Sequence, residues 1–279
     1  MRAIWATILC GFLLVPSLAS ADAADAHYRL AKTLRAEGRY EEALAEIDKA
    51  IAARPTSAEG HLTRGTILRR LERYDEALSA FDRAIQIDPK GAQAYGLAGA
   101  ALLRLKRNKA AIPYLKKATE LAPEDPNNWL NLGVAYRKLG NTDAAIKAYQ
   151  QGLAKAPNDP LLLNNLGVAL RRARRYDESI EVLEKAAKVS PGDADVTRNL
   201  AVAYRGAERY EEAIPVYLEA IQRNDDNAGL IFDLAVCYEK LGKNEAAIKA
   251  YERYIRATKK SDPAAAARAR ATVERLKKK

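Results

Sequence analysis

A period of 34 residues runs through most of this 279-residue chain, and no other feature constrains its fold as strongly. One column of small residues shows the spacing: Ala43, Ala77, Ala111, Ala145, Ser179, Ala213 and Ala247. This column defines seven repeats, numbered 1 to 7 in chain order: 24–57, 58–91, 92–125, 126–159, 160–193, 194–227 and 228–261. Because no insertion breaks the register, we expect one stack of similar units and not ordinary independent domains.

Each repeat carries the pattern of two amphipathic helices. Apolar residues at positions 4, 7, 8 and 11 form a first helical stripe, as in Trp129, Leu132, Gly133 and Tyr136. Positions 20, 21, 24 and 27 form a second, as in Ala77, Leu78, Phe81 and Ala84. Small residues recur at position 8, where a larger side chain would hold neighbouring helices apart. A polar turn separates the stripes, with Gly38, Gly140 or Gly242 in three repeats.

The ends of the predicted helices are also marked. In six of the seven repeats, position 34 can accept a hydrogen bond from the next helix: Ser57, Asp125, Asp159, Asp193, Asn227 and Ser261. Pro126 and Pro160 then occupy the favoured first helical position. Acidic pairs such as Asp177-Glu178 begin second helices, where they suit the positive end of the helix dipole. Pro113 and Pro215 fall early in second helices, where they are either tolerated or produce a slight kink.

This pattern resembles the tetratricopeptide repeat (TPR) family. Trp129-x2-Leu132-Gly133-x2-Tyr136 matches the first-helix signature, and Ala77-x3-Phe81 with Pro89 behind it matches the second. The resemblance implies an all-α fold, a right-handed α-solenoid of seven helix-turn-helix repeats. Pro263 begins a further segment, 262–279, which we interpret as a basic capping helix. Its end, Lys277-Lys278-Lys279, leaves a frayed contact arm as the alternative.

The first 21 residues have the layout of a secretory signal peptide. Arg2 is followed by the short apolar run from Ala3 to Val15, and small residues at the end predict cleavage after Ala21. An uncleaved anchor helix and lipidation of Cys10 are the alternatives. The run is short for an anchor, and Cys10 lies inside it instead of at its end. We therefore expect an exported protein, periplasmic or secreted, with no membrane span and with its repeats in 22–261.

No pattern in the sequence predicts catalysis. His27 and His61 both occupy position 4, the packing position of Trp129, and no acidic or cysteine column joins them at the spacing of metal ligands. Cys237 would be the only thiol after cleavage, so the mature protein would have no internal disulfide. Neither histidine is close enough in sequence to activate that thiol, and there is no phosphate-binding loop. We expect no enzyme activity, no cofactor, no metal and no small-molecule substrate.

By resemblance to TPR proteins, the first helices line a concave groove. Its predicted ligand residues are arginines at positions 12 and 13, valines at position 9 and asparagines at position 6: Arg35, Arg69, Asn131, Val134, Arg137, Asn165, Val168, Arg171, Arg172, Asn199, Val202 and Arg205. Guanidinium groups pair with carboxylates, asparagine amides can hold a peptide backbone, and valines can bury apolar side chains. The alternative is structural, because basic residues in the last helical turn also favour the negative end of the helix dipole.

These features predict an exported scaffold or adaptor that binds an acidic or carboxylate-bearing peptide or protein in the groove. The net charge of +10 supports a second hypothesis, salt-sensitive binding of polyanions or anionic envelope surfaces. Export and the lack of aromatic stacking residues along the arginines argue against nucleic acid. Self-association through the open ends or the groove is a third hypothesis.

Overall fold

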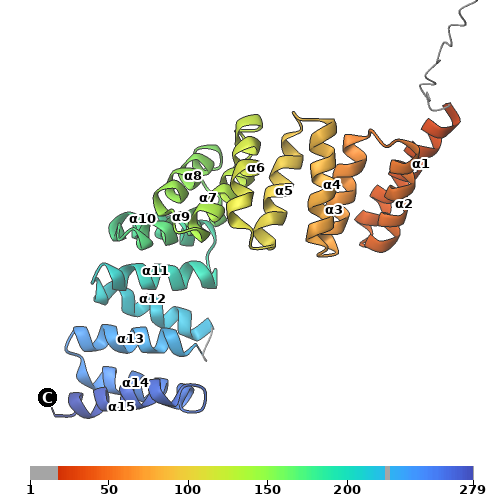
Figure 1. The fold of residues 1–279 in the computed structure, drawn as a ribbon. Helices are drawn as coiled ribbons and strands as arrows, with labels where there is room; N and C mark the ends of the chain where they lie inside the picture. The colour runs from red at the N-terminus through yellow and green to blue at the C-terminus, as the bar shows by residue number, and fades with distance from the viewer. Residues whose placement is uncertain (1–17, 224–226, 279) are drawn as a thin grey trace, which may run out of the picture. The chain divides into compact units, whose positions relative to one another are not determined.

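The computed structural model describes residues 18–223 and 227–278, and in this part of the chain every regular element is an α-helix (Figure 1). The helices are α1 (Leu18–Ala36), α2 (Tyr40–Ala53), α3 (Ala58–Arg70), α4 (Tyr74–Ile87), α5 (Ala92–Arg104), α6 (Asn108–Leu121), α7 (Pro126–Lys138), α8 (Thr142–Lys155), α9 (Pro160–Arg172), α10 (Tyr176–Val189), α11 (Ala194–Gly206), α12 (Tyr210–Arg223), α13 (Ala228–Lys240), α14 (Asn244–Thr258) and α15 (Pro263–Leu276). Most of the predicted signal segment lies outside the described residues. None of the described helices is long and apolar enough to cross a membrane.

The helix bounds follow the predicted period. From repeat 2 onwards, first helices occupy positions 1 to 13, and second helices begin at position 17 in every repeat. Helices α6 and α12 continue through Pro113 and Pro215, so neither proline ends its helix. The prediction of an all-α solenoid of helix pairs with a further helix at the C-terminus is confirmed.

The chain divides into two compact units, one extending to Arg107 and one beginning at Asn108. The N-terminal unit holds α1 to α5, and the C-terminal unit holds α6 to α15. Within each unit, first helices of successive repeats contact one another: α1 with α3 and α3 with α5, then α7 with α9, α9 with α11 and α11 with α13. No two second helices make such a contact among the described residues. First helices therefore lie on the inner side of each stack.

Every turn between the two helices of a repeat has a left-handed backbone at position 15. Gly38, Gly140 and Gly242 have φ angles of 79°, 79° and 69°. The other four repeats place a residue with a side chain there: Glu72, Lys106, Arg174 and Glu208, with φ from 58° to 60°. This conformation is unfavourable by about 1 kcal/mol or more for a non-glycine residue. The packing of the two helices therefore imposes the turn, whichever residue occupies it.

Side-chain caps begin the first helices as predicted at five of the six expected positions. In one example, Asp159 accepts a hydrogen bond from the backbone N–H of Leu162 at 2.8 Å. The prediction is wrong for Ser261, because Asp262 caps α15. Pro263 explains the shift: it lies one position later in the register than Pro126 and Pro160 and takes the first helical position, so the residue before it becomes the cap.

The acidic residues that begin second helices have a second role besides the helix dipole. In repeats 1, 2, 5 and 6, an arginine at position 16 pairs with a glutamate at position 19: Arg39 with Glu42, Arg73 with Glu76, Arg175 with Glu178, and Arg209 with Glu212. In repeat 5 the Nε and Nη2 atoms of Arg175 both lie 2.6 Å from the carboxylate of Glu178. These pairs are exposed, so they orient the helix end more than they stabilise the fold.

Small residues at position 8 bring the two helices of a repeat together. A Cβ atom placed on Gly167 would lie 2.4 Å from Cγ of Leu183, and one on Gly133 would lie 2.3 Å from Cε1 of Tyr149. Position 24, which carries Leu183 and Tyr149, is fully buried in both repeats. The close approach of the glycine at position 8 to the large side chain at position 24 therefore sets the spacing of the helix pair.

Helix α15 closes the last repeat. Its buried residues Ala269, Val273 and Leu276 share a hydrophobic cluster with Tyr251 of α14. On its polar side, Arg275 donates a hydrogen bond of 2.6 Å to the carboxylate of Glu239 in α13. The helix thus covers an apolar face that would otherwise meet water, as a solenoid end requires.

We predict that Gly167→Ala destabilises the fold by about 1–3 kcal/mol, because the added methyl group would force Leu183 from its buried position. This loss would exceed the gain of about 1 kcal/mol that alanine brings within a helix. Thermal denaturation followed by circular dichroism measures the effect. The control is Gly229→Ala in α13, where the only neighbouring atom is Oδ1 of Asn227 at 3.3 Å. Equal melting temperatures for the two variants would contradict the packing argument.

Candidate functional site

In the N-terminal unit, the predicted ligand residues Arg35 and Arg69 lie at the ends of α1 and α3. Both are half-buried. The Nε atom of Arg69 is covered by protein and has no hydrogen-bond partner among the described residues. Burial lowers the pKa of Arg69, and repulsion from Arg70 adds to this effect. Arg69 is therefore a cation with one buried donor that none of the described residues accepts.

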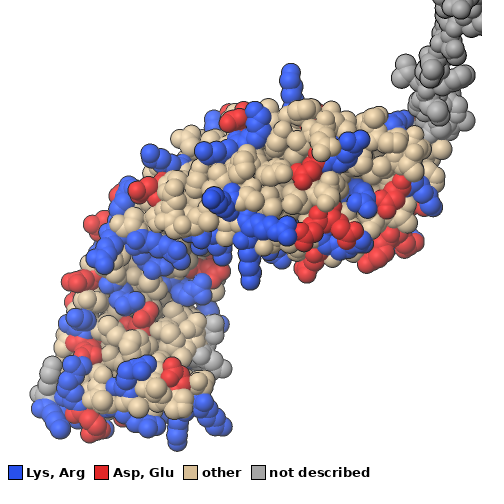
Figure 2. Space-filling model, viewed as in Figure 1, with Lys and Arg blue, Asp and Glu red and all other residues tan. Residues whose placement is uncertain are grey.

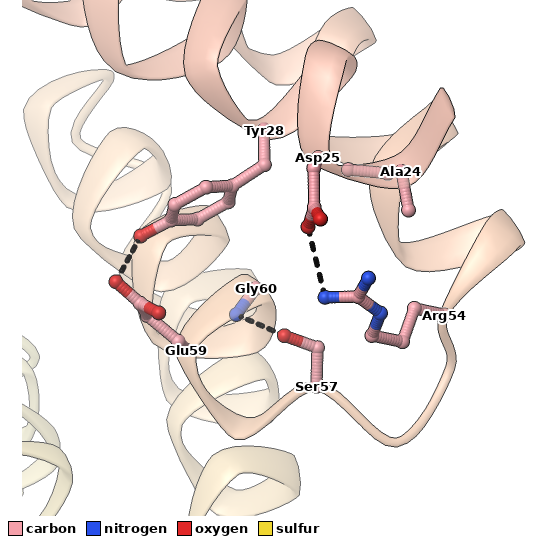
Figure 3. Close-up of a pocket in the computed structure, with 8 residues that line it drawn as sticks. Ala24, Asp25, Tyr28, Arg54, Ser57, Glu59 and Gly60 are labelled. Carbon is pink, nitrogen blue, oxygen red and sulfur yellow. Dashed lines mark hydrogen bonds and ion pairs between the residues drawn. The ribbon is translucent and has the colours of Figure 1, made fainter. Parts of the chain in front are cut away.

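A hollow of about 60 Å³ lies near the start of the same unit (Figure 3). An ion pair of 2.9 Å between Asp25 and Arg54 forms one side, and a hydrogen bond from the hydroxyl of Tyr28 to Glu59 forms another. Burial raises the pKa of Tyr28, and the bond to Glu59 raises it further. Because the charged groups of this hollow already have partners within the chain, we assign them a structural role.

The C-terminal unit brings three predicted arginines to the ends of consecutive first helices: Arg137 on α7, Arg171 on α9 and Arg205 on α11. The Nε atoms of Arg137 and Arg171 are buried and have no partner among the described residues. Burial lowers the pKa of Arg171, and the neighbouring cations Arg172 and Arg205 also lower it. On the face in Figure 2, lysine and arginine predominate over much of this unit, whereas acidic residues gather beside α1 to α4.

Arg205 differs from the other two because the chain itself supplies its acceptors. Its Nε atom donates to the hydroxyl of Tyr217 at 3.2 Å, and its Nη2 atom lies 3.5 Å from Oδ1 of Asp233. The same tyrosine donates to Oδ2 of Asp233 at 3.2 Å. Burial alone would lower the pKa of Arg205, but Asp233 and Tyr217 raise it. Arg205 is thus engaged inside the protein.

The predicted valines and asparagines lie on the same first helices. Val134, Val168 and Val202 are half-buried on α7, α9 and α11, as are the neighbouring Asn131, Asn165 and Asn199. Two of the amides already donate one hydrogen bond each within the protein. Asn165 donates to the carbonyl of Leu161 at 2.8 Å, and Asn199 donates to the side chain of Asn164 at 2.9 Å. Arg172 is exposed at the end of α9.

Sequence reasoning missed the tyrosines that approach these arginines. Position 24 belongs to the predicted apolar stripe of the second helix, but in repeats 4, 6 and 7 it carries a tyrosine with a buried hydroxyl: Tyr149, Tyr217 and Tyr251. Tyr251 donates to Glu239, the acidic residue that takes position 12 in repeat 7, at 2.7 Å. The sequence signal for these contacts is the recurrence of tyrosine at position 24 in three repeats that carry a charged residue at position 12.

The two histidines and the cysteine have structural surroundings. The Nδ1 atom of His27 lies 2.6 Å from the carboxylate of Glu46, and the Nε2 atom of His61 lies 3.0 Å from the carbonyl of Pro55. Trp129 makes the equivalent bond to the carbonyl of Pro123 at 2.8 Å. Among the described residues, no group of three or more His, Cys, Asp or Glu side chains could hold a metal ion.

The repeated helix pairs, with first helices on the inner side of each stack, define a helical-repeat scaffold. Three family models described as tetratricopeptide repeat match the sequence: one at residues 62–126, 130–194 and 164–228, a second at 204–271 and a third at 24–57. The chain belongs to the tetratricopeptide repeat family, as the resemblance predicted. Its fold is that of a scaffold which binds proteins or peptides. None of the curated proteins matches the sequence significantly.

Several solved structures share this fold. MamA from Desulfovibrio magneticus RS-1 is 25% identical, with a TM-score of 0.58 over 62% of this chain and 98% of that one. YrrB, a TPR protein with an unusual peptide-binding site, is 24% identical, with a TM-score of 0.56 over 63% of this chain and 90% of that one. PilW, a widely conserved type IV pilus biogenesis factor, is 22% identical, with a TM-score of 0.64 over 73% of this chain and 94% of that one.

We predict that the thiol of Cys237 is unreactive in the folded protein at pH 8. The side chain is buried, and burial raises its pKa from 9.0 to about 11. About a hundredfold less thiolate therefore forms than in the unfolded chain. Because the folded-state pKa is the higher one, the stability linked to this group is complete below about pH 9 and is lost as the pH rises toward 11.

Titration with a chromogenic disulfide reagent, with and without denaturant, measures this difference in a chain that starts at Asp22 and so lacks Cys10. The Cys237→Ala variant provides the background signal. Rapid labelling of the folded protein would contradict the buried position of the thiol.

Proposed function

We propose that the protein is an exported scaffold that holds an acidic or carboxylate-bearing segment of another protein against the first helices of its C-terminal unit. The observation that carries this proposal is the pair Arg137 and Arg171. Each presents a half-buried guanidinium whose Nε atom has no acceptor among the described residues. The protein thus supplies this donor of each guanidinium with no acceptor, and because both arginines are only half-buried, the carboxylate of a partner can pair with the guanidinium from its accessible side.

The electrostatic surroundings favour a negative partner. Arg171 is close enough to Arg172 and Arg205 for their charges to lower its pKa, and the charge of Asp233, which also feels Arg171, is already paired with Arg205. A carboxylate placed among these arginines relieves the repulsion of Arg171 by its neighbours and forms charge-assisted hydrogen bonds. The half-buried valines Val134 and Val168 offer apolar contact beside the charges. Acidic side chains interspersed with apolar ones therefore suit this face.

We expect Arg137→Glu combined with Arg171→Glu to weaken binding of an acidic peptide about a hundredfold or more, because both acceptor sites become repulsive. The probe is a synthetic peptide of alternating Glu and Leu, and fluorescence anisotropy measures its affinity. The glutamine version of the peptide should bind weakly to every form of the protein.

The matched control carries Lys147→Glu and Lys185→Glu, two exposed residues of the second helices α8 and α10. This variant has the same change in net charge and should retain most of the affinity. Equal weakening in both variants would mean that net charge alone attracts the peptide. Absence of peptide binding to the unaltered protein would contradict the proposal.

Export is the second part of the proposal, and it rests on the sequence of the first 21 residues. We expect the protein recovered from the cell envelope or medium to begin at Asp22, as intact mass spectrometry would show. The Ala21→Arg variant should keep the full-length mass, because arginine does not fit the small-residue site of a signal peptidase. A wild-type chain recovered in the cytoplasm with its first residues intact would contradict export.

The C-terminal end supports a second candidate function, binding to an anionic surface. A hollow of about 390 Å³ between α14 and α15 is bordered by Arg256, Arg270 and Lys277, although Glu252 and Glu274 also border it. The affinity of such binding would fall steeply as the salt concentration rises, and the Arg137 and Arg171 substitutions would leave it unchanged. These two properties separate it from recognition by the first helices.

A further inference from the structure

The C-terminal unit contains a complete carboxylate site built from its own side chains. In repeat 6, Nη2 of Arg205 forms an ion pair with Oδ1 of Asp233 at 3.5 Å. The hydroxyl of Tyr217 donates a hydrogen bond to Oδ2 of the same carboxylate at 3.2 Å. The tyrosine also accepts a bond of 3.2 Å from Nε of Arg205. Asp233 comes from position 6 of the following repeat, so two adjacent repeats build the site.

Two repeats earlier, the same positions carry the same arginine and tyrosine but no carboxylate. Arg137 corresponds to Arg205, and Tyr149 corresponds to Tyr217. The third position, that of Asp233, is Asn165. The Nε atom of Arg137 and the hydroxyl of Tyr149 are both buried. Arg137 lies close enough to Tyr149 to hydrogen-bond to it, but among the described residues no acceptor is found for the proton of the hydroxyl. Tyr149 is 0% exposed, as is Tyr217 in the complete site.

The arginine and the tyrosine of this incomplete site are neighbours. Burial raises the pKa of Tyr149, and a side-chain hydrogen bond with Arg137 opposes the rise, as do the charges of Arg137 and Arg172; Arg205 does the same for Tyr217. Asn165 does not replace the missing acid, because it is neutral and its amide donates to the carbonyl of Leu161 in its own helix. In its hydrogen bond with Arg137 the hydroxyl of Tyr149 is the acceptor, so its own proton and the positive charge of the arginine both call for a negatively charged acceptor beside them.

We infer that Arg137 and Tyr149 form a subsite for one carboxylate of the bound partner, which takes the place that Asp233 occupies in repeat 6. This inference rests on the proposed function and adds to it a fixed point of attachment. No other repeat offers the same open pair. Opposite the arginines of repeats 1, 2 and 5, position 24 carries Ile47, Phe81 and Leu183, and repeat 7 carries Glu239 in place of arginine. A single open subsite fixes the register of a segment lying across the first helices.

The test is to supply the carboxylate from within the chain. In the Asn165→Asp variant of the full-length protein, the new acid stands where Asp233 stands in repeat 6 and competes with the partner for Arg137 and Tyr149. We expect its affinity for the Glu–Leu peptide to fall about tenfold or more. We also expect its preference for this peptide over the glutamine version to fall, with no loss of melting temperature.

The matched control is Gln151→Glu, which also changes a neutral amide into an acid. Gln151 is exposed on the second helix α8 and lies outside the predicted ligand residues. Its affinity should stay within about threefold of the unaltered protein, since an exposed charge away from the binding face has only a screened effect. The reciprocal variant, Asp233→Asn, opens the repeat 6 site and should increase the preference for the Glu peptide.

The outcomes separate the two ideas. Peptide binding that is lost with the Arg137 and Arg171 substitutions, yet is equal in the Asn165→Asp and Gln151→Glu variants, would overturn the subsite and leave the proposed function standing. Failure of the unaltered protein to prefer the Glu peptide over the Gln peptide would overturn both. A selective loss in Asn165→Asp together with a gain in Asp233→Asn supports the subsite.

Discussion

The structure depends on the close approach of the two helices within each repeat. Where position 8 is glycine, the backbone of the first helix lies against the large side chain at position 24 of the second, as Gly167 does against Leu183. Position 24 is completely buried in repeats 4 and 5. In repeats 4 and 6 the arginine at position 12 contacts the tyrosine at position 24, Arg137 with Tyr149 and Arg205 with Tyr217. In these two repeats, the packing contact and the candidate binding face therefore share residues.

A repeated fold allows one position to be compared across seven similar surroundings. Position 24 is tyrosine in repeats 4, 6 and 7, and its hydroxyl meets three different situations. In repeat 7 it donates to Glu239, in repeat 6 it lies between Arg205 and Asp233, and in repeat 4 it lies beside Arg137 with no acceptor for its proton among the described residues. The backbone is nearly the same in each case. The difference in chemistry therefore comes from one or two side chains, and the repeats that complete a network show what an incomplete one lacks.

The sequence predicted the fold to the level of individual helices because each repeat carries its own local signals. Periodic apolar residues, acidic caps and small columns act within a few residues of chain, and most helix bounds and caps follow from them. Ser261 was the exception, because Pro263 shifts the register by one position and the pattern of the earlier repeats did not apply. The partners of the arginines were harder to predict. Arg205 has an acceptor within the protein because Asp233 follows in the next repeat. The residues at position 12 do not by themselves indicate that contact.

The contacts between first helices have a mechanical consequence. Successive repeats touch along their first helices, and each second helix from α2 to α12 also packs against the first helix of the next repeat, whereas the described second helices do not touch one another. Every interface between repeats therefore includes a first helix. A ligand that draws adjacent first helices together or pushes them apart would change the pitch of the stack by small rotations spread over several interfaces. Such rotations would fit the face to the length of its ligand without breaking the core of any single repeat.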